Sequence, residues 1–352
     1  MLLLLAGLIS AVLVAGCGSS SSSSSTEASS STGSSGSENQ SASSGEEEAK
    51  ESFEPITVSY PFVALVQFYP LVLAEEDGVF EEYGLDVSVK TVPDPTISAA
   101  MNSGSVQFHL TAPPVLEFAN NAGVDTELIG VYAEHTESTL TAVPGINSVK
   151  ELVGKKIMET TPTGQSVIFS KYALHKAGVN YDEVKFVPVG TTAPAESLIS
   201  GLVDAANTDS IQQALAEEGL KGAKVIEDFS TLEWPGAQIW GSGSWMEGHE
   251  EETAAFLQAM NAAVEKWNED PAAAKKVISK TAKTTEPKLL NQLYEATKSE
   301  FNSGPQPVQP PSEQLEAKVI ELLNIAEFSE FTEEDAKEGV IWTSKYWDAA
   351  FE

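Results

Sequence analysis

The chain has 352 residues, which is more than one hydrophobic core usually holds, so two lobes are expected. It carries 52 acidic and 20 basic residues, all of the latter lysine, and its formal net charge is −32. This imbalance argues against a nucleic-acid partner and against a basic patch for membrane surfaces.

The first 52 residues predict a lipid anchor followed by a tether. Residues 2–16 are apolar, too short to span a membrane comfortably, and end in small residues immediately before the single cysteine, Cys17. This resembles a bacterial lipobox, so we expect a signal peptide over residues 1–17 and lipid on Cys17, although no Lys or Arg precedes the apolar segment. An ordinary cleaved signal with a chance cysteine is the alternative. Residues 18–52 are rich in Ser, Gly and Glu with almost nothing apolar, which predicts a disordered tether.

The folded body opens with a predicted βαβ unit, because strands at residues 56–60 and 85–89 flank a helix. Pro70 suits the first turn of that helix, where its missing N–H costs nothing. Gly78 is expected to end the helix, since glycine tolerates a positive φ.

Strands and helices continue to alternate along the chain. Such alternation predicts mostly parallel sheets covered by helices on both faces, an α/β fold. The expected strands are residues 106–110, 128–132, 184–189, 203–206 and 237–240. The expected helices are residues 96–103, 115–121, 164–177, 193–201, 251–269, 272–280, 288–301 and 312–324, with Thr163 placed to cap the helix from Gly164 and a short last helix near Tyr346.

Three stretches carry a family resemblance: PLVLAEEDGVFEEYGLDVSV at residues 70–89, SVKELVGKKI at 148–157, and ESLISGLVDAANTDS at 196–210. They resemble the solute-binding proteins of ABC importers, in the group that binds nitrate, alkanesulfonates, taurine and thiamine-pyrimidine precursors. The resemblance implies the two-lobed type 2 periplasmic-binding-protein fold, with two crossovers forming a hinge. Lobe 1 is then expected at residues 53–145 and 236–352, and lobe 2 at residues 146–235.

The same resemblance implies a function without catalysis or cofactor. The protein would act as a monomer on the outer face of the cell membrane, anchored by lipid on Cys17. It would deliver a small molecule, such as a thiamine-precursor-like heterocycle or a sulfonate- or nitrate-type solute, to an ABC permease driven by a separate ATPase. A ligand-sensing surface lipoprotein is one alternative. An enzyme like the thiamine-pyrimidine synthases is another, but the cysteine-rich motif of those cytosolic proteins is absent here.

The motifs of catalytic and metal sites are also missing. The sequence has no HExxH, CxxC, GxSxG or phosphate-binding loop. Its four histidines, at positions 109, 135, 175 and 249, share no spacing, so we expect no metal site and no catalytic residue.

In a two-lobed fold of this kind, ligands lie between the lobes, where loops from strands to helices and helix N-termini contact them. Loops at residues 61–69, 108–113 and 160–166 qualify, and Asn207 and Asp209 follow a strand on the opposite side. The side chains predicted to contact the ligand are Phe62, Gln67, Phe68, Tyr69, His109, Thr111, Thr161, Thr163, Gln165, Asn207 and Trp240. Core packing is the alternative for Phe62, Phe68 and His109, packing of the hinge is the alternative for Trp240, and helix capping is the alternative for Thr163.

The absence of arginine bears on the ligand. Nitrate, sulfonate and phosphate are often held by a planar guanidinium, so an anionic ligand would here need Lys, helix N-termini and hydroxyls. The sequence therefore favours a neutral or cationic ligand with a flat face, stacked on aromatic rings.

Overall fold

The computed structural model describes residues 53–61, 65–189, 193–297, 299–328 and 331–352. Cys17, the predicted tether and Phe62 lie outside these residues. Among the described helices, none has the length and apolar character needed to cross a membrane.

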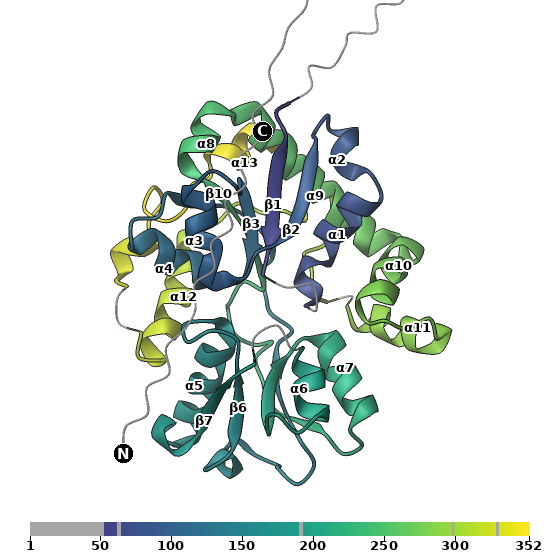
Figure 1. Cartoon of the computed structure of the whole chain (residues 1–352). Helices are drawn as coiled ribbons and strands as arrows, with labels where there is room; N and C mark the ends of the chain where they lie inside the picture. Colours follow the sequence, from purple (N-terminus) through teal and green to yellow (C-terminus); the bar gives the residue numbers. More distant parts are fainter. Residues whose placement is uncertain (1–52, 62–64, 190–192, 298, 329–330) are drawn as a thin grey trace, which may run out of the picture. The chain divides into compact units, whose positions relative to one another are not determined.

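Ten strands of the described residues form two five-stranded sheets, one in each of two lobes (Figure 1). The sheet of lobe 1 has the order β2-β1-β3-β10-β4, and the sheet of lobe 2 has the order β7-β6-β8-β5-β9. The strands are β1 Ile56–Tyr60, β2 Val87–Thr91, β3 Phe108–Thr111, β4 Thr126–Ala133, β5 Thr139–Ala142, β6 Lys156–Glu159, β7 Lys185–Pro188, β8 Ala205–Thr208, β9 Lys224–Asp228 and β10 Ala237–Ser242.

Each sheet contains one strand that runs against its neighbours. In lobe 1, β1 pairs in parallel with β2 and β3, whereas β10 is antiparallel to β3 and β4. In lobe 2, β6 is parallel to β7 and β8, whereas β5 is antiparallel to β8 and β9. Both antiparallel strands, β5 and β10, are the first strands after the chain crosses from one lobe to the other. The predicted α/β fold with mostly parallel sheets is confirmed.

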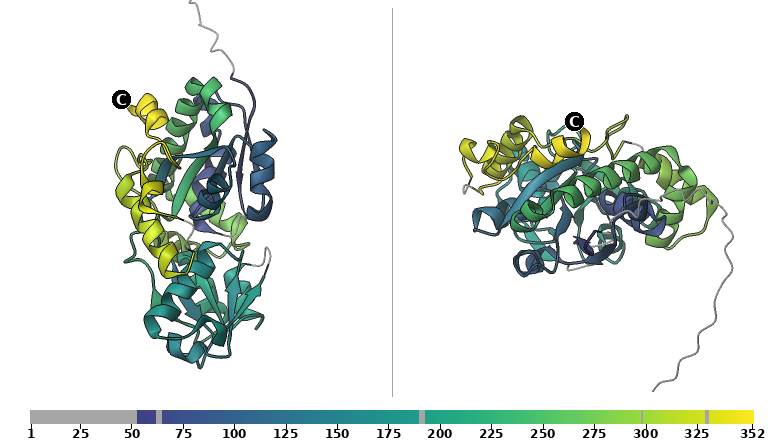
Figure 2. Two further views of the ribbon diagram at one scale, coloured as in Figure 1. Left: turned by 90° about the vertical axis from the view of Figure 1, so that its left-hand side faces the viewer. Right: turned by 90° about the horizontal axis from the view of Figure 1, so that it is seen from above.

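Helices pack around the sheets, as Figures 1 and 2 show. They are α1 Tyr69–Glu76, α2 Val79–Glu82, α3 Asp94–Asn102, α4 Val115–Asn121, α5 Gln165–Ala177, α6 Pro194–Ile199, α7 Ser210–Gly219, α8 Gly243–Gly248, α9 Glu250–Glu269, α10 Pro271–Thr281, α11 Pro287–Ala296, α12 Glu313–Ile325 and α13 Lys345–Phe351. Single 3-10 turns occur at η1 Val66–Phe68, η2 Val149–Leu152, η3 Tyr181–Glu183 and η4 Glu333–Ala336.

The helix boundaries confirm some sequence predictions and correct others. Helix α1 has its C-cap at Asp77 and is followed by Gly78 with φ of 71°, as predicted. The predicted cap by Thr163 is wrong, because Gly164 occupies the N-cap of α5 and no side chain bonds there. The helix expected to reach residue 301 ends at Ala296.

The lobe boundaries also differ from the expectation. Strand β5 was assigned to lobe 1 by the predicted boundary at residue 145, but it hydrogen-bonds to β8 and β9 in the sheet of lobe 2. The first crossing is therefore the segment between β4 and β5. In addition, α12 packs on α5, with Val319 and Leu323 in the same apolar cluster as Ile168 (Figure 2). This return to lobe 2 was not predicted, because the pattern of an amphipathic helix does not specify which surface the helix covers.

Stacked aromatic rings fill the two cores. In lobe 1, Phe108 of β3 stacks on Phe256 of α9 with ring centroids 4.2 Å apart. In lobe 2, Phe169 of α5 lies 4.7 Å from Phe229 and 5.2 Å from Trp234. Since both Phe229 and Trp234 belong to the second crossing, between β9 and β10, the core of lobe 2 fixes the start of that crossing.

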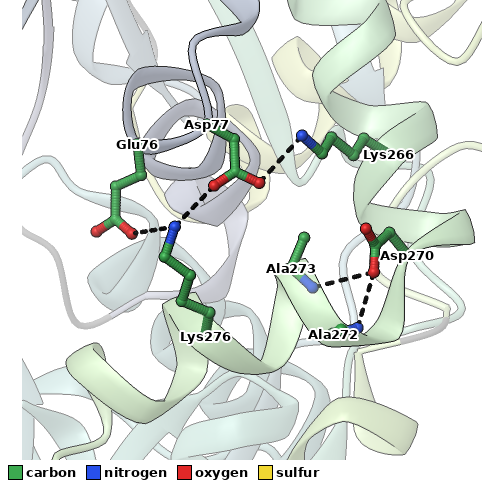
Figure 3. Close-up of polar contacts among 7 residues, drawn as sticks. All are labelled: Glu76, Asp77, Lys266, Asp270, Ala272, Ala273 and Lys276. Atoms are coloured by element: carbon green, nitrogen blue, oxygen red, sulfur yellow. Dashed lines mark hydrogen bonds and ion pairs between the residues drawn. The ribbon is translucent and has the colours of Figure 1, made fainter.

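Ion pairs hold the end of α1 against α9 and α10 (Figure 3). Asp77 accepts from Lys266 of α9 at 3.0 Å and from Lys276 of α10 at 2.8 Å, and Glu76 lies 3.7 Å from Lys276. These hydrogen bonds, first that of Lys276 and then that of Lys266, lower the pKa of Asp77. Asp270 between α9 and α10 caps the latter by accepting from Ala272 and Ala273. The network fixes the C-terminal end of a helix whose N-terminal end lies near the cleft described below.

Two buried carboxyl groups meet where α4, β10 and α12 come together. Glu117 of α4 and Glu316 of α12 are 1% and 0% exposed. Trp240 Nε1 donates to Gln238 Oε1 at 2.9 Å, and Gln238 Nε2 donates to Glu316 Oε1 at 3.4 Å. Burial raises the pKa of Glu117 to about 8, and burial followed by the nearby charge of Glu117 raises the pKa of Glu316 well above its usual range. Glu117 therefore keeps its proton at neutral pH.

Replacing one of these carboxyl groups should flatten the pH dependence of stability. Because the folded-state pKa lies above the unfolded one, the stabilising contribution of the protonated carboxyl is full below the unfolded-state pKa and is lost as the pH rises through the folded-state value. We expect the free energy of unfolding, measured in urea, to fall less between about pH 6 and about pH 9 for Glu316→Gln than for the natural chain. Glu313→Gln, an exposed change on the same helix, is the control and should keep the natural slope. Equal slopes for Glu316→Gln and the natural chain would contradict the assignment.

Candidate ligand-binding cleft

A cleft lies at the carboxyl ends of parallel strands from both lobes. It encloses about 840 Å³, counted with its open mouth. Pro61 after β1 and Thr111 at the end of β3 line it from lobe 1, and Thr160 after β6 and Thr208 at the end of β8 line it from lobe 2. Parallel strands bring the loops that follow them to one edge of a sheet, which is where α/β folds bind ligands. Here two such edges contribute to one cleft.

The two crossings also contribute to the lining. Thr136 and Ser138 come from the first crossing and Gly236 from the second. Gly236 N donates to Ala133 O at 2.8 Å, and a Cβ on Gly236 would lie 2.6 Å from the backbone O of His135. Any other residue at this position would push the two crossings apart, so glycine lets them run side by side.

The structure brings five of the predicted ligand contacts together. Gln67, Phe68, Thr111, Gln165 and Asn207 all line the cleft. Each lies at or just beyond a strand end or at a helix start, the position from which it was predicted. These residues remain the proposed contacts.

Three other predicted residues are buried in the core of lobe 1. Tyr69 is 1% exposed and its ring lies 5.7 Å from that of Trp267. His109 is fully buried, and its Nδ1 hydrogen-bonds with Ser59 Oγ at 2.8 Å. Trp240 pairs with His109 in the register of β3 and β10 and is equally buried. Both lie inside the sheet rather than at the carboxyl ends of its parallel strands, since β3 and β10 are hydrogen-bonded side by side there.

Thr161 and Thr163 lie in the loop before α5 but do not line the cleft. Phe62 falls outside the described residues. The structure adds lining residues that the sequence analysis did not select, above all Glu300. Glu300 follows α11 by a few residues, and no motif or periodicity marked it, since it lies far along the chain from every strand end.

The wall formed by lobe 2 is built on Asn207. Its Nδ2 donates to Ser166 O and to Ser170 Oγ, both at 2.9 Å, so α5 holds the amide in one orientation. Its Oδ1 is buried without a hydrogen-bond partner. Beside it, Gln165 Oε1 accepts from Trp234 Nε1 at 3.2 Å, which connects the cleft to the second crossing.

Asp209 joins the lobes. Its Oδ1 accepts from Gln212 N at 2.7 Å and caps α7, and its Oδ2 accepts from Val66 N of lobe 1 at 3.0 Å. Burial raises the pKa of Asp209 to about 6, and hydrogen bonds from backbone N–H groups offset part of that effect. The carboxylate is therefore a costly group that the backbone of both lobes stabilises.

Glu300 lies next to Asp209. Ser210 N donates to Glu300 Oε1 at 3.1 Å, and Ser210 Oγ also hydrogen-bonds to that oxygen. Burial, followed by the negative charge of Asp209, raises the pKa of Glu300 to about 8. Within the described part of the chain, no group of three or more His, Cys, Asp or Glu side chains is arranged to hold a metal ion.

Comparison with known proteins agrees with this architecture. The NMT1/THI5-like family matches residues 66–274, which is more than half of the sequence. The chain belongs to that family. No curated protein sequence gives a significant match.

Solved structures show the same fold at low sequence identity. The alkanesulfonate-binding protein SsuA of Xanthomonas axonopodis pv. citri, bound to MOPS, has a TM-score of 0.66 and 18% identity over 80% of this chain and 97% of its own. The Candida albicans CA3427 gene product, described as having the generic periplasmic binding protein fold, has a TM-score of 0.64 and 17% identity over 81% and 94%. The nitrate-binding protein NrtA of Synechocystis PCC 6803 has a TM-score of 0.61 and 11% identity over 84% and 88%. The family member therefore has the periplasmic-binding-protein fold, as the sequence resemblance implied.

Gln165 should stabilise the second crossing through Trp234. Trp234 is fully buried, so Gln165→Ala leaves its Nε1–H without a partner and should lower the free energy of unfolding by about 1–3 kcal/mol. Gln165→Glu keeps an acceptor and should cost less. Gln292→Ala on the exposed face of α11 is the control. Chemical denaturation measures all three, and equal stability of Gln165→Ala and the control would exclude this role.

Proposed function

We propose that this family member is an extracytoplasmic solute-binding protein of an ABC importer. It would capture a small molecule between its lobes and deliver it to a permease driven by a separate ATPase. The observation that carries the proposal is the cleft itself, which is lined by strand-end loops of both lobes and by both crossings. The alkanesulfonate- and nitrate-binding proteins of the same fold support it.

The chemistry of the lining supports binding rather than catalysis. Nucleophilic catalysis needs a nucleophile within hydrogen-bond reach of a base. The described lining contains no Cys, His, Lys or Tyr, and the two oxygens of Asp209 already accept backbone N–H groups. Apart from the carboxyl group of Glu300, the remaining polar groups are hydroxyls and amides suited to hydrogen-bonding a solute.

The two crossings would act as the hinge. Domain closure around a ligand requires a few linking residues that absorb changes in backbone angles. Thr136, Ser138 and Gly236 belong to the linking segments and line the cleft, so a ligand that contacts them would sense the relative position of the lobes.

Ligand binding should stabilise the protein. A solute at about a hundred times its dissociation constant should raise the free energy of unfolding by about 2.7 kcal/mol. A thermal-shift screen with sulfonates, nitrate, bicarbonate, pyrimidine and other vitamin precursors, amines and amino acids would find it. Thr111→Val should weaken the response to the hit by removing a lining hydroxyl, whereas Thr91→Val, on the exposed end of β2, should not. If a solute stabilises Thr111→Val and Thr91→Val equally, it binds outside the cleft.

We further propose that lipid on Cys17 anchors the protein to the outer face of the cell membrane. The apolar segment before Cys17 and the Ser- and Gly-rich residues after it support this. Cys17→Ser should move the protein from the membrane fraction to the soluble fraction of expressing cells, and Ser19→Ala should not. Retention of Cys17→Ser in the membrane fraction would count against a lipid anchor.

A further inference from the structure

The charged groups of the cleft are of one sign. Of the described side chains that line it, only Asp209 and Glu300 are ionisable in the physiological range, and both are acidic. Each is 8% exposed, so water screens them weakly. None of the described lining residues is a lysine, although the sequence has 20 basic residues.

The two carboxyl groups lie close together but come from different lobes. Asp209 begins α7 of lobe 2, whereas Glu300 follows α11, and the two are connected through Ser210, whose N–H donates to Glu300 Oε1 at 3.1 Å. Both hydrogen bonds to Glu300 described above end on Oε1. A donor group of a ligand at Oε2 would therefore compete with neither of them.

A further acceptor lies in the same cleft. Asn207 Oδ1 is buried without a partner, because its amide nitrogen is committed to Ser166 and Ser170. A buried acceptor without a donor destabilises the protein, and a ligand N–H or O–H would remove that cost. Glu300 Oε2 and Asn207 Oδ1 could therefore both accept a hydrogen bond from a donor group of the ligand.

The helix N-termini and the charges of the cleft disfavour an anionic ligand. The N-terminus of α7, which would otherwise attract negative charge, already donates the N–H of Gln212 to the carboxylate of Asp209, its cap. The N-terminus of α5 has no side-chain cap, but an anion there would share the cleft with the carboxylate of Asp209, and no described lining residue carries a positive charge. Helix ends alone would have to offset that repulsion.

We propose that the cleft binds a small organic cation, whose ammonium or protonated ring nitrogen contacts Asp209 and Glu300 and whose apolar part packs on Phe68. This rests on the proposed solute-binding function and names its class of solute. Phe68 lines the cleft but is only 1% exposed, and its ring stacks on that of Tyr60 with centroids 5.6 Å apart, so it offers a rigid apolar contact rather than an open aromatic face. The net charge of −32 would also speed the approach of a cation.

Binding of a cation should release protons. Burial and the neighbouring Asp209 raise the pKa of Glu300 to about 8, so much of Glu300 is protonated at neutral pH in the free protein. Glu137 adds to this effect on Glu300, and the buried hydroxyl of Tyr69 lies near Asp209. A bound cation favours the charged carboxylate and lowers its pKa, so affinity should rise with pH up to about pH 8.

Calorimetric titration of the full chain in detergent tests the proposal. Benzylamine, choline and putrescine are the cationic probes, and benzyl alcohol and benzenesulfonate are the uncharged and anionic counterparts of the first. We expect at least one cation to bind, with a heat that depends on the ionisation enthalpy of the buffer because a proton is released. Glu300→Gln keeps an acceptor for Ser210, should fold, and should weaken that cation roughly tenfold or more while abolishing the proton release. Glu269→Gln removes a charge from the exposed end of α9 and should leave binding unchanged.

Three results would overturn the proposal: no binding by any cation, equal or tighter binding of the matched alcohol or sulfonate, or undiminished cation affinity in Glu300→Gln. Circular dichroism melts of each variant identify a loss of binding that comes from unfolding, and in that case the rise of cation affinity with pH in the natural chain replaces Glu300→Gln as the test. Binding of benzenesulfonate or nitrate alone would reject the cation and leave the solute-binding function in place. If no solute binds in this titration and none stabilises the protein in the thermal-shift screen, both the cation proposal and the proposed solute-binding function are rejected.

Discussion

The buried carboxylate of Asp209 is the contact on which the cleft depends. It accepts one N–H from the first turn of α7 and another from Val66, so a single side chain ties the loop after β8 to the loop before α1. That connection places Asn207 on one side of the cleft and Gln67 and Phe68 on the other. Burial raises the pKa of this carboxyl to about 6, so the protein keeps a charge there at a cost in stability. Costly ionisable groups of this kind concentrate at functional sites.

Chain topology explains why the site is shared by two lobes. The chain leaves lobe 1 after β4 and returns with β10, and each crossing ends in an antiparallel strand inserted into a parallel sheet. The parallel strands therefore direct their carboxyl ends toward the crossings, where their loops meet. Gly236 allows the two crossings to run together within hydrogen-bonding distance.

Charge is distributed unevenly between the surface and the cleft. The lysines that form ion pairs in the described residues do so on the outside, as in the network of Asp77 with Lys266 and Lys276 (Figure 3). Inside the cleft the carboxyl groups have backbone and hydroxyl donors instead. A lysine beside them would neutralise the site, but none of the described lining residues is a lysine, so in our proposal the solute supplies the positive charge.

The sequence by itself determined the family, the α/β class and the position of strand-end loops such as those with Gln67, Thr111 and Asn207. These follow from local periodicity, from the positions of glycine and proline and from short sequence motifs, each of which involves only neighbouring residues. The tertiary structure decided the contacts between distant parts of the chain. It paired His109 of β3 with Trp240 of the antiparallel strand β10 inside the sheet, placed β5 in lobe 2, packed α12 on α5 and brought Glu300 beside Asp209. Each of these is a contact between residues far apart in the chain, and such contacts are set by which apolar faces cover one another, information that no short stretch of sequence contains.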